Sequence, residues 1–321
     1  MPTERRTKAQ RNLKPSSFNQ RKPTISIIGA GRLGTALALA LTGRGYRVEA
    51  VMARRLAHAR RAAAQIAAHT RALSATQADS LPPSDLLFIT TPDDQIAHTA
   101  AHLAASHEKR GAQAEGRAAL HCSGALSSDV LSPLEGVGYQ TGSMHPLISV
   151  SDPLQGAERL RGGFYAIEGT RSAVRVARGV VRDLGGESFS VNSRDKALYH
   201  AAALMASGHM VALLDIAVEM LKDCGLTEKR AQSVLLPLME STLANLSARD
   251  TAHALTGTFA RADAATMRRH VDALGGANIE DALEVYRLLG RRSLRLAEKL
   301  GVDGEALKKI GRLLKEHEGD A

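Results

Sequence analysis

The first half of the chain alternates short apolar runs with alanine-rich stretches of helical period. Residues 24–28 read as a buried strand, which leads into a glycine-rich turn and then into an Ala/Leu helix over about 35–43. The same pattern predicts further strands and helices, with strands at 47–52, 85–90, 118–122 and 140–143 and helices over 56–69 and 95–105. This alternation predicts a parallel α/β sheet that is covered by helices on both faces.

The pattern changes near residue 192. A strand–helix–strand unit over residues 164–191 extends the predicted sheet, and after residue 193 the strand signals stop. Helices are predicted in the remainder, over 193–223, 227–247, 263–274 and 278–299. We therefore expect an α/β domain at 23–192 and an all-α domain at 193–321, preceded by a disordered basic tail at 1–22.

The turn after the first strand contains three glycines in the spacing G-x-G-x-x-G. In Rossmann-type dinucleotide-binding domains the first glycine permits a tight turn, the second lets a pyrophosphate approach the backbone, and the third allows close helix packing. The helix that begins here presents unpaired N–H groups to the anion. We predict a Rossmann-type, mostly parallel sheet and place the cofactor phosphates against Gly29, Gly31, Arg32, Leu33 and Gly34. The alternative is a glycine-rich turn without a ligand.

The end of the second strand bears on the choice of cofactor. The chain reads Met52-Ala53-Arg54-Arg55 there, without the acidic residue that holds the ribose 2′-hydroxyl of NAD. A guanidinium can bind two oxygens of a 2′-phosphate, whereas a carboxylate would repel that group. The sequence therefore favours NADP(H) over NAD(H), with Arg54 and Arg55 as phosphate ligands. In the alternative, both arginines are only the solvated start of a helix.

The net charge of +9 is concentrated in the predicted tail. Residues 1–22 contain seven Lys or Arg and one Glu, and thus account for six of these nine charges. The rest of the chain needs no polyanionic partner, so nucleic-acid binding is not expected. No apolar run of about 18 residues is free of charge, so we expect no membrane partner. Two cysteines are too few to staple a chain of this size, which fits a cytoplasmic location.

Three loops are predicted to lie beyond the carboxyl ends of the strands, where ligands bind in an open α/β sheet. The first contains Thr91 and Pro92, the second Ser123 and the third His145. We place Thr91, Pro92 and Ser123 against the cofactor, and Ser123 and His145 in a substrate pocket beside the nicotinamide. A histidine before a proline lies in extended backbone, where its imidazole can donate to a substrate oxyanion. A purely structural histidine is the equal alternative.

Residues 194–207 carry a polar stripe on an otherwise apolar helix. At about 100° per residue, Lys196 and His200 lie about 40° apart and Lys196 and Ser207 about 20° apart. A buried polar stripe is costly unless its groups are satisfied, which favours a ligand site. We predict Lys196 to stabilise or protonate a developing oxyanion, His200 to be its proton partner and Ser207 to line the pocket. In the alternative, Lys196 is exposed in the first turn and His200 makes one structural hydrogen bond.

Other chemistries have little support in the sequence. His98 and His102 are spaced i, i+4, but no third ligand accompanies them, so we predict no metal site and regard them as surface histidines. The chain contains neither a nucleophile elbow nor a Walker lysine. The hydrolase and nucleoside-triphosphatase classes are therefore not expected.

With these motifs placed, the chain after the tail resembles a family of oxidoreductases that join a Rossmann-like NADP-binding domain to a helical C-terminal domain of unassigned function. They are relatives of pyrroline-5-carboxylate reductase, ketopantoate reductase and the β-hydroxyacid dehydrogenases. The resemblance rests on IIGAGRLG, VMARR, FITTPDDQI, LHCSGALSSDVL, GSMHPL, DKALYHAAALMASG and ALTGTFARAD. It implies an NADP(H)-dependent enzyme and a homodimer packed through the helical domains.

The resemblance also bears on single residues. In the β-hydroxyacid dehydrogenases a Lys and an Asn four residues later form the catalytic pair, and Lys196 and His200 match that spacing with His in place of Asn. The motif HPL at 145–147 is similar to one in prephenate dehydrogenases. The chain departs from the family pattern at Ala262, where relatives more often have a glycine between Arg and Asp.

Two functions follow from these observations. The first is an NADP(H)-dependent oxidoreductase that moves hydride to or from a small carbonyl, imine or hydroxyl compound. The second is a non-catalytic NADP(H)-binding sensor or regulatory dimer. The substrate depends on pocket shape, which a shared fold does not specify.

Overall fold

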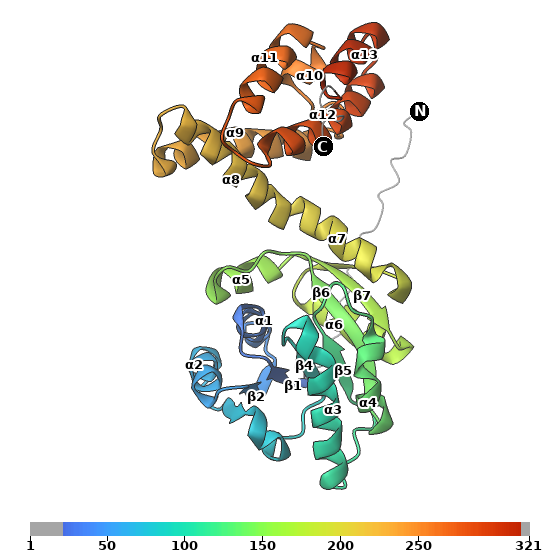
Figure 1. Cartoon of the computed structure of the whole chain (residues 1–321). Helices are drawn as coiled ribbons and strands as arrows, with labels where there is room; N and C mark the ends of the chain where they lie inside the picture. Colours follow the sequence, from blue (N-terminus) through green and yellow to red (C-terminus); the bar gives the residue numbers. More distant parts are fainter. Residues whose placement is uncertain (1–21, 316–321) are drawn as a thin grey trace, which may run out of the picture. The chain divides into compact units, whose positions relative to one another are not determined.

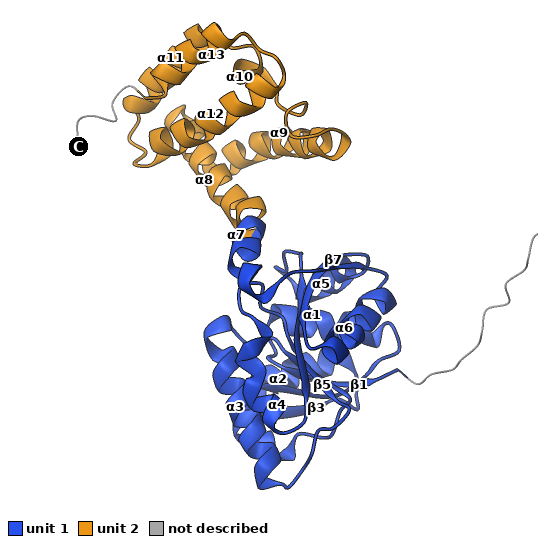
Figure 2. Cartoon of the chain, turned by 90° about the vertical axis from the view of Figure 1, so that its right-hand side faces the viewer, with its two compact units in different colours: residues 1–203 blue, residues 204–321 orange. Residues whose placement is uncertain are grey.

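The computed structural model describes residues 22–315. These residues form two compact units, which divide after Ala203 (Figure 2). The division lies inside helix α7 (Lys196–Ala206), whereas the predicted boundary lies at residue 192. The reason is that the first turns of α7 bind the sheet of unit 1, through Lys196 to Ser143 and through Tyr199 to His145.

The predicted basic tail lies outside the described residues, with the exception of Lys22. The ammonium group of Lys22 lies 2.6 Å from a carboxylate oxygen of Asp183 and 5.7 Å from the ring centre of Tyr46. Lys22 therefore makes contacts typical of a folded residue and belongs with unit 1.

Unit 1 is built on one eight-stranded sheet (Figure 1). Its strands are β1 (Thr24–Ile28), β2 (Arg47–Ala53), β3 (Arg71–Ser74), β4 (Leu86–Ile89), β5 (Ala118–His121), β6 (Gln140–Pro146), β7 (Phe164–Gly169) and β8 (Glu187–Ser190). They lie in the order β3-β2-β1-β4-β5-β6-β7-β8, and all neighbours are parallel except β6 and β7. The first six strands have the Rossmann order, so the predicted fold class is confirmed.

Helices cover both faces of this sheet. One face packs against α1 (Arg32–Thr42), α2 (Leu56–Ile66), α5 (Pro153–Leu160) and α6 (Arg171–Asp183), and the other against α3 (Asp93–Lys109) and α4 (Ser132–Gly136). Successive residues of a strand point to opposite faces. Ile27 therefore lies in the first core and Ile28 in the second, which explains why β1 reads as a continuous apolar run.

Some short elements of unit 1 escape the sequence pattern. The predicted helix over 56–69 ends at Ile66, and the chain then turns into β3, a strand of four residues. Helices α4 and α5 were likewise not predicted. Elements of this length contain too few residues to establish a period.

Unit 2 is helical, as predicted. It contains α8 (Gly208–Asp223), α9 (Glu228–Ala248), α10 (Gly257–Ala260), α11 (Ala264–Gly275), α12 (Ala282–Lys299) and α13 (Gly304–Leu313). Buried residues of α11 and α13, among them Met267 and Ile310, form its small core. The segment predicted to be helical over 193–223 is helical, but it divides into α7 and α8 at Ser207, where φ is −129° and ψ is −75°.

The stretch Ser193–Asp223 is long and apolar enough, by length and composition alone, to cross a membrane. It is the one such stretch among residues 22–315, and its residues 197–214 contain no Asp, Glu, Lys or Arg, so the expectation that no run of about 18 residues is free of charge is wrong. Its beginning is part of the folded unit 1, where Lys196 is buried against the sheet.

Candidate functional site

A cavity of about 880 Å³ opens at the carboxyl ends of β1, β2 and β4. The strand order reverses direction between β1 and β4, which is the place where ligands bind in open α/β sheets. Residues from the glycine turn, the end of β2, η1 (Ala75–Ser80) and α3 line it: Ile28, Gly29, Ala30, Gly31, Arg32, Leu33, Met52, Ala53, Arg54, His58, Ala75, Thr76, Thr90, Thr91, Pro92, Gln95, His98, Thr99, His102 and Val150. The size is that of a pocket for a cofactor.

The three glycines of the turn have distinct structural roles. Gly29 has a φ of +122°, a conformation that side chains rarely adopt, and a Cβ at this position would lie 2.7 Å from the carbonyl carbon of Thr90. A Cβ at Gly34 would overlap the carbonyl oxygen of Gly29. Gly31 has open space beside it and lines the cavity. The turn therefore has the geometry that lets a pyrophosphate approach the backbone at the start of α1.

The lining of the cavity is cationic. Arg32 and Arg54 line it together with three histidines, His58, His98 and His102, whereas no Asp or Glu is among its lining residues. Glu49 lies earlier in β2 and is bound by Arg47 at 2.8 Å. The end of β2 thus offers a guanidinium, and no carboxylate, to a ribose.

The predicted cofactor residues are brought together with three exceptions. Gly29, Gly31, Arg32, Leu33, Arg54, Thr91 and Pro92 line the cavity. Gly34 is buried behind the turn, Arg55 is the exposed N-cap of α2, and Ser123 lies outside the lining. The sequence did not indicate that His98 and His102 line this cavity. Their spacing places them on one face of α3, but only the packing of α3 beside the glycine turn shows that this face lines the cavity.

Lys196 is buried, with an exposed fraction of 2%. Its ammonium nitrogen donates to the carbonyl oxygen of Ser123 at 3.0 Å and to the hydroxyl of Ser143 at 2.7 Å, and lies 3.8 Å from a carboxylate oxygen of Glu168. Burial lowers the pKa of Lys196, and the Glu168 carboxylate opposes that shift. An ammonium group has three N–H donors; two of them make these hydrogen bonds, and the Glu168 carboxylate is an ion-pair partner. Lys196 is therefore held in the wall of the site.

Glu168 and Ser123 complete this buried network. The Glu168 carboxylate accepts from the backbone N–H and the hydroxyl of Ser128, both at 2.8 Å. The Ser123 hydroxyl donates to Asp93 at 2.7 Å and accepts from the N–H groups of the two residues after Gly124. The hydroxyl of Ser123 is thus fully used within the protein, and it ties the loop after β5 to the residue that follows Pro92 of the cavity.

Two imidazoles lie over Gly124. A Cβ at Gly124 would overlap Nδ1 of His200 and would lie 2.9 Å from Cε1 and Nε2 of His145. The two rings meet edge to face with centres 5.5 Å apart. Nδ1 of His145 is hydrogen bonded to the hydroxyl of Tyr199 at 2.7 Å, and Nδ1 of His200 is buried without a partner among the described residues. At the corner formed by Gly124, His145 and His200, the predicted pocket therefore keeps a ring nitrogen without a partner among the described residues.

The imidazole of His145 is kept neutral. Burial, with the charges of His200 and Lys196 nearby, lowers the pKa of His145 to about 4. Burial raises the pKa of Tyr199 to about 12. Both groups are therefore uncharged at neutral pH.

The predicted polar stripe on α7 is realised only in part. Lys196 and His200 both face the sheet of unit 1, but Ser207 is the exposed N-cap of α8 and belongs to unit 2. The break at Ser207 interrupts the helical phase on which its assignment to the stripe depends. Among the described residues, no three His, Cys, Asp or Glu side chains gather as a metal site requires.

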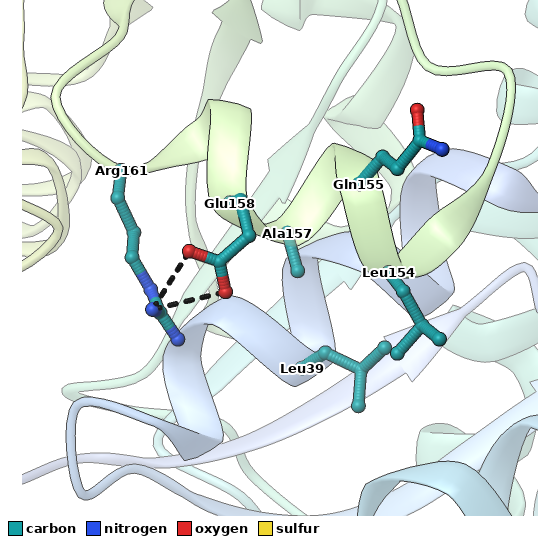
Figure 3. A pocket seen from close by; sticks show the side chains of 6 residues that line it. All are labelled: Leu39, Leu154, Gln155, Ala157, Glu158 and Arg161. Atoms are coloured by element: carbon teal, nitrogen blue, oxygen red, sulfur yellow. Dashed lines mark hydrogen bonds and ion pairs between the residues drawn. The ribbon is translucent and has the colours of Figure 1, made fainter.

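A second cavity of about 390 Å³ lies between α1 and α5 (Figure 3). It is lined by Leu39, Leu154, Gln155, Ala157, Glu158 and Arg161. Its two charged groups, Glu158 and Arg161, bind each other at 3.1 Å, and the rest of its lining is mostly apolar. It therefore offers no reactive group.

Two protein-family models match the chain. Residues 9–146 match a Rossmann-like domain, and residues 164–293 match a domain of unknown function, DUF2520. The chain joins a Rossmann-like domain to a DUF2520 domain. The resemblance stated from the sequence is thereby confirmed, and the DUF2520 match includes β7, α6 and β8 of unit 1 as well as most of unit 2. No curated protein sequence matches the chain.

Several solved structures are similar in fold to most of the chain. A candidate NADP oxidoreductase, BF3122 from Bacteroides fragilis, has 23% identity and a TM-score of 0.68, over 85% of this chain and 98% of that one. Protein TM1727 from Thermotoga maritima has 21% identity and a TM-score of 0.65, over 86% and 99%. Plasmodium falciparum pyrroline carboxylate reductase, solved with NADP bound, has 10% identity and a TM-score of 0.53, over 91% and 98%. At these identities the likeness shows the fold.

Proposed function

We propose that the protein is an NADP(H)-dependent oxidoreductase. The observation that carries the proposal is the cavity at the glycine turn, whose lining contains two arginines, three histidines and no acid. A dinucleotide with a 2′-phosphate is strongly anionic, and a cationic pocket at a helix N-terminus complements that charge. The folds of NADP-dependent reductases among the solved structures support the same cofactor class.

The residues present fit the cofactor at both of its anionic groups. Gly31 leaves room for the pyrophosphate at the N-terminus of α1, and Arg54 at the end of β2 is the counterpart of the 2′-phosphate. The hydroxyl of Thr91 is buried at the cavity wall without a partner among the described residues. A buried hydroxyl of this kind is costly unless a ligand satisfies it, which supports Thr91 as a cofactor contact.

The proposed reaction is the reduction of a small carbonyl compound or imine, or the oxidation of a hydroxyl compound in the reverse direction. When bound, the nicotinamide supplies or takes up a hydride, that is, two electrons and a proton. His145 and His200 orient the substrate above Gly124, and His200 exchanges the proton with the substrate heteroatom. The ammonium of Lys196 supports the loop from behind rather than supplying a proton, because it is buried and two of its donors are bound by Ser123 and Ser143.

Cofactor titrations test this function. We expect NADPH to bind more tightly than NADH, and Arg54→Ala to weaken NADPH binding by about 10- to 100-fold, the worth of a charge-assisted contact, with little effect on NADH. Arg55→Ala is the matched control, because Arg55 is the next residue but lies outside the cavity lining. Equal affinities for the two cofactors in the parent protein would contradict the choice of NADP(H).

A substrate screen distinguishes the enzyme from a non-catalytic NADP(H)-binding sensor. Small ketones, aldehydes and imines are tested with NADPH, and hydroxyacids are tested with NADP⁺. Oxidation or reduction of any of them supports the enzyme. Tight NADPH binding without turnover across the screen supports the sensor.

We also propose a homodimer formed through unit 2. Large apolar side chains on α8 and α9 are exposed: Val211, Leu213, Val234, Leu236, Leu238, Leu243 and Leu246. Large apolar side chains that are exposed on neighbouring helices are typical of an interface. Light scattering after gel filtration should give twice the chain mass, and Leu238→Glu should give a monomer. A monomeric parent would contradict the proposal.

A further inference from the structure

Four rings form a series of edge contacts at the corner over Gly124. Phe189 of β8 meets Tyr199 with ring centres 5.9 Å apart, Tyr199 meets His145 at 5.6 Å, and His145 meets His200 at 5.5 Å. Interplanar angles of 71° to 86° make all three contacts T-shaped. The ring of Tyr199 is thus held between Phe189 and His145, and its hydroxyl is delivered to one nitrogen of His145.

The direction of the hydrogen bond between Tyr199 and His145 follows from the two groups. At 2.7 Å, one of them must donate and the other accept. Within the described part of the chain, the Tyr199 hydroxyl has no other acceptor, so donation from Nδ1 of His145 would leave the phenol proton unpaired in a half-buried place. A phenol is also a better donor than acceptor, because its lone pair is delocalised into the ring. Tyr199 therefore donates and Nδ1 accepts.

We infer that Tyr199 is a positioning residue that fixes His145 as the neutral tautomer with its proton on Nε2. The two ring nitrogens of a neutral histidine have opposite roles, so an accepting Nδ1 makes Nε2 the donor. The edge that carries Nε2 faces Gly124. Tyr199 thus sets which atom of His145 offers an N–H to the site.

This inference rests on the proposed function and narrows its substrate class. A neutral imidazole N–H can stabilise charge that develops on a carbonyl oxygen. The ammonium of Lys196 lies behind the same corner, and the Glu168 carboxylate is bound both by this ammonium and by Ser128. A neutral N–H donor at this corner favours a ketone or aldehyde, whose oxygen becomes negative, over an iminium ion.

The depressed pKa of His145 agrees with this role. Burial is its main cause, followed by His200 and Lys196. His145 would thus stay neutral, and its Nε2 proton in place, over the whole range from mildly acidic to alkaline pH.

Nitrogen-15 spectra of histidine-labelled protein, without cofactor or substrate, test the tautomer directly. We expect the His145 signals, assigned by their loss in His145→Gln, to show an accepting Nδ1 and a protonated Nε2 from pH 6 to 8. In Tyr199→Phe, which keeps the ring contacts and removes the hydroxyl, the tautomers should mix or reverse. A parent protein with the proton on Nδ1, or an unchanged tautomer in Tyr199→Phe, would overturn the inference.

The chain provides a matched control in unit 2. The hydroxyl of Tyr286 is hydrogen bonded to Nδ1 of His270 at 2.8 Å, with T-shaped rings 5.9 Å apart. Tyr286→Phe should change the signals of His270 and leave those of His145 unaltered. A shift of the His145 tautomer in this control would mean that Tyr199→Phe acts through a general loss of structure, and would overturn the specific role of Tyr199.

The test separates this inference from the proposed function. The tautomer is read in the free protein, whereas the cofactor titrations read the cavity at the glycine turn. If the parent protein shows the expected His145 tautomer but does not bind NADPH, only the proposed function is contradicted. For the substrate class, faster turnover of imines than of ketones and aldehydes in the screen would overturn the preference for a carbonyl compound.

Discussion

The ammonium nitrogen of Lys196 lies 2.7 Å from the hydroxyl oxygen of Ser143, at the centre of a buried network that reaches Glu168 and the carbonyl of Ser123. These partners come from three strands or the loops that follow them. Lys196 therefore connects the start of α7 with the loop that carries Gly124. The main effect of Lys196 is therefore to hold α7 and this loop in place, which determines the shape of the site.

Replacing Lys196 by Met should lower the free energy of unfolding by about 3 kcal/mol, because the Glu168 carboxylate would lose its cation in a buried place. Adding Glu168→Gln should recover part of this loss, since a neutral amide needs no counter-charge. Urea unfolding measures both effects. NADPH affinity should stay close to that of the parent, because Lys196 does not line the cofactor cavity.

The matched control is Lys109→Met, which removes an exposed ammonium that lies 2.7 Å from Asp79. Its urea midpoint should equal that of the parent, because exposed ion pairs contribute little. If Lys196→Met unfolded like this control, the buried network would not hold the site together, and a purely chemical role for Lys196 would be favoured.

Two glycines of the phosphate-binding turn should respond differently to alanine. At Gly31 a Cβ would meet nothing within 4 Å, so Gly31→Ala should fold normally but lose NADPH affinity at least about tenfold, because the methyl group occupies the cofactor's space. At Gly34 a Cβ would overlap backbone, so Gly34→Ala should also lower the melting temperature. Calorimetry and fluorescence titration separate the two effects. Equal NADPH affinity in the parent and Gly31→Ala would place the pyrophosphate elsewhere.

Stability should fall between pH 7 and pH 5 in part because of His145. The unfolded chain takes up a proton near the ordinary histidine pKa of 6.5, whereas folded His145 does so only near 4. The stabilisation is thus present above pH 6.5 and is lost as pH falls toward 4, at about 2 kcal/mol by pH 5. Urea unfolding of the parent and His145→Gln at both pH values should show the smaller pH dependence in the variant. A parallel pH dependence would show that His145 titrates normally.

Ala262 is the one described residue other than glycine with a positive φ, of 50°. A side chain in this region costs about 1–2 kcal/mol, which a glycine avoids, although glycine also gives the unfolded chain more freedom. Ala262→Gly should therefore raise the stability of unit 2 by about 0.5 kcal/mol, measured by thermal unfolding. Ala260→Gly, at the end of helix α10, should instead lower it. A loss of stability in Ala262→Gly would mean that its methyl group packs favourably enough to outweigh the strain.

Much of the fold was accessible from the sequence because it depends on local signals. The apolar run at β1, the glycine spacing after it and the absence of an acid after β2 predict a dinucleotide-binding turn from neighbouring residues alone. Short elements such as β3 were not accessible, because four residues cannot establish a period. The break at Ser207 was also missed, since alanine and leucine on both sides favour a continuous helix.

In the candidate site, too, local sequence signals indicated some features, and only the packing of distant segments decided the others. The sequence by itself determined which residues form the glycine turn and indicated Lys196, His200 and His145 as candidate site residues, because their types and spacing are local properties. Only the tertiary structure decided that Lys196 is enclosed by three acceptors, that Ser207 lies apart in unit 2, and that Tyr199 binds His145. These relationships join residues that are 28 to 73 positions apart or separated by a break in a helix, and they exist only once β5, β6, β7 and α7 pack together.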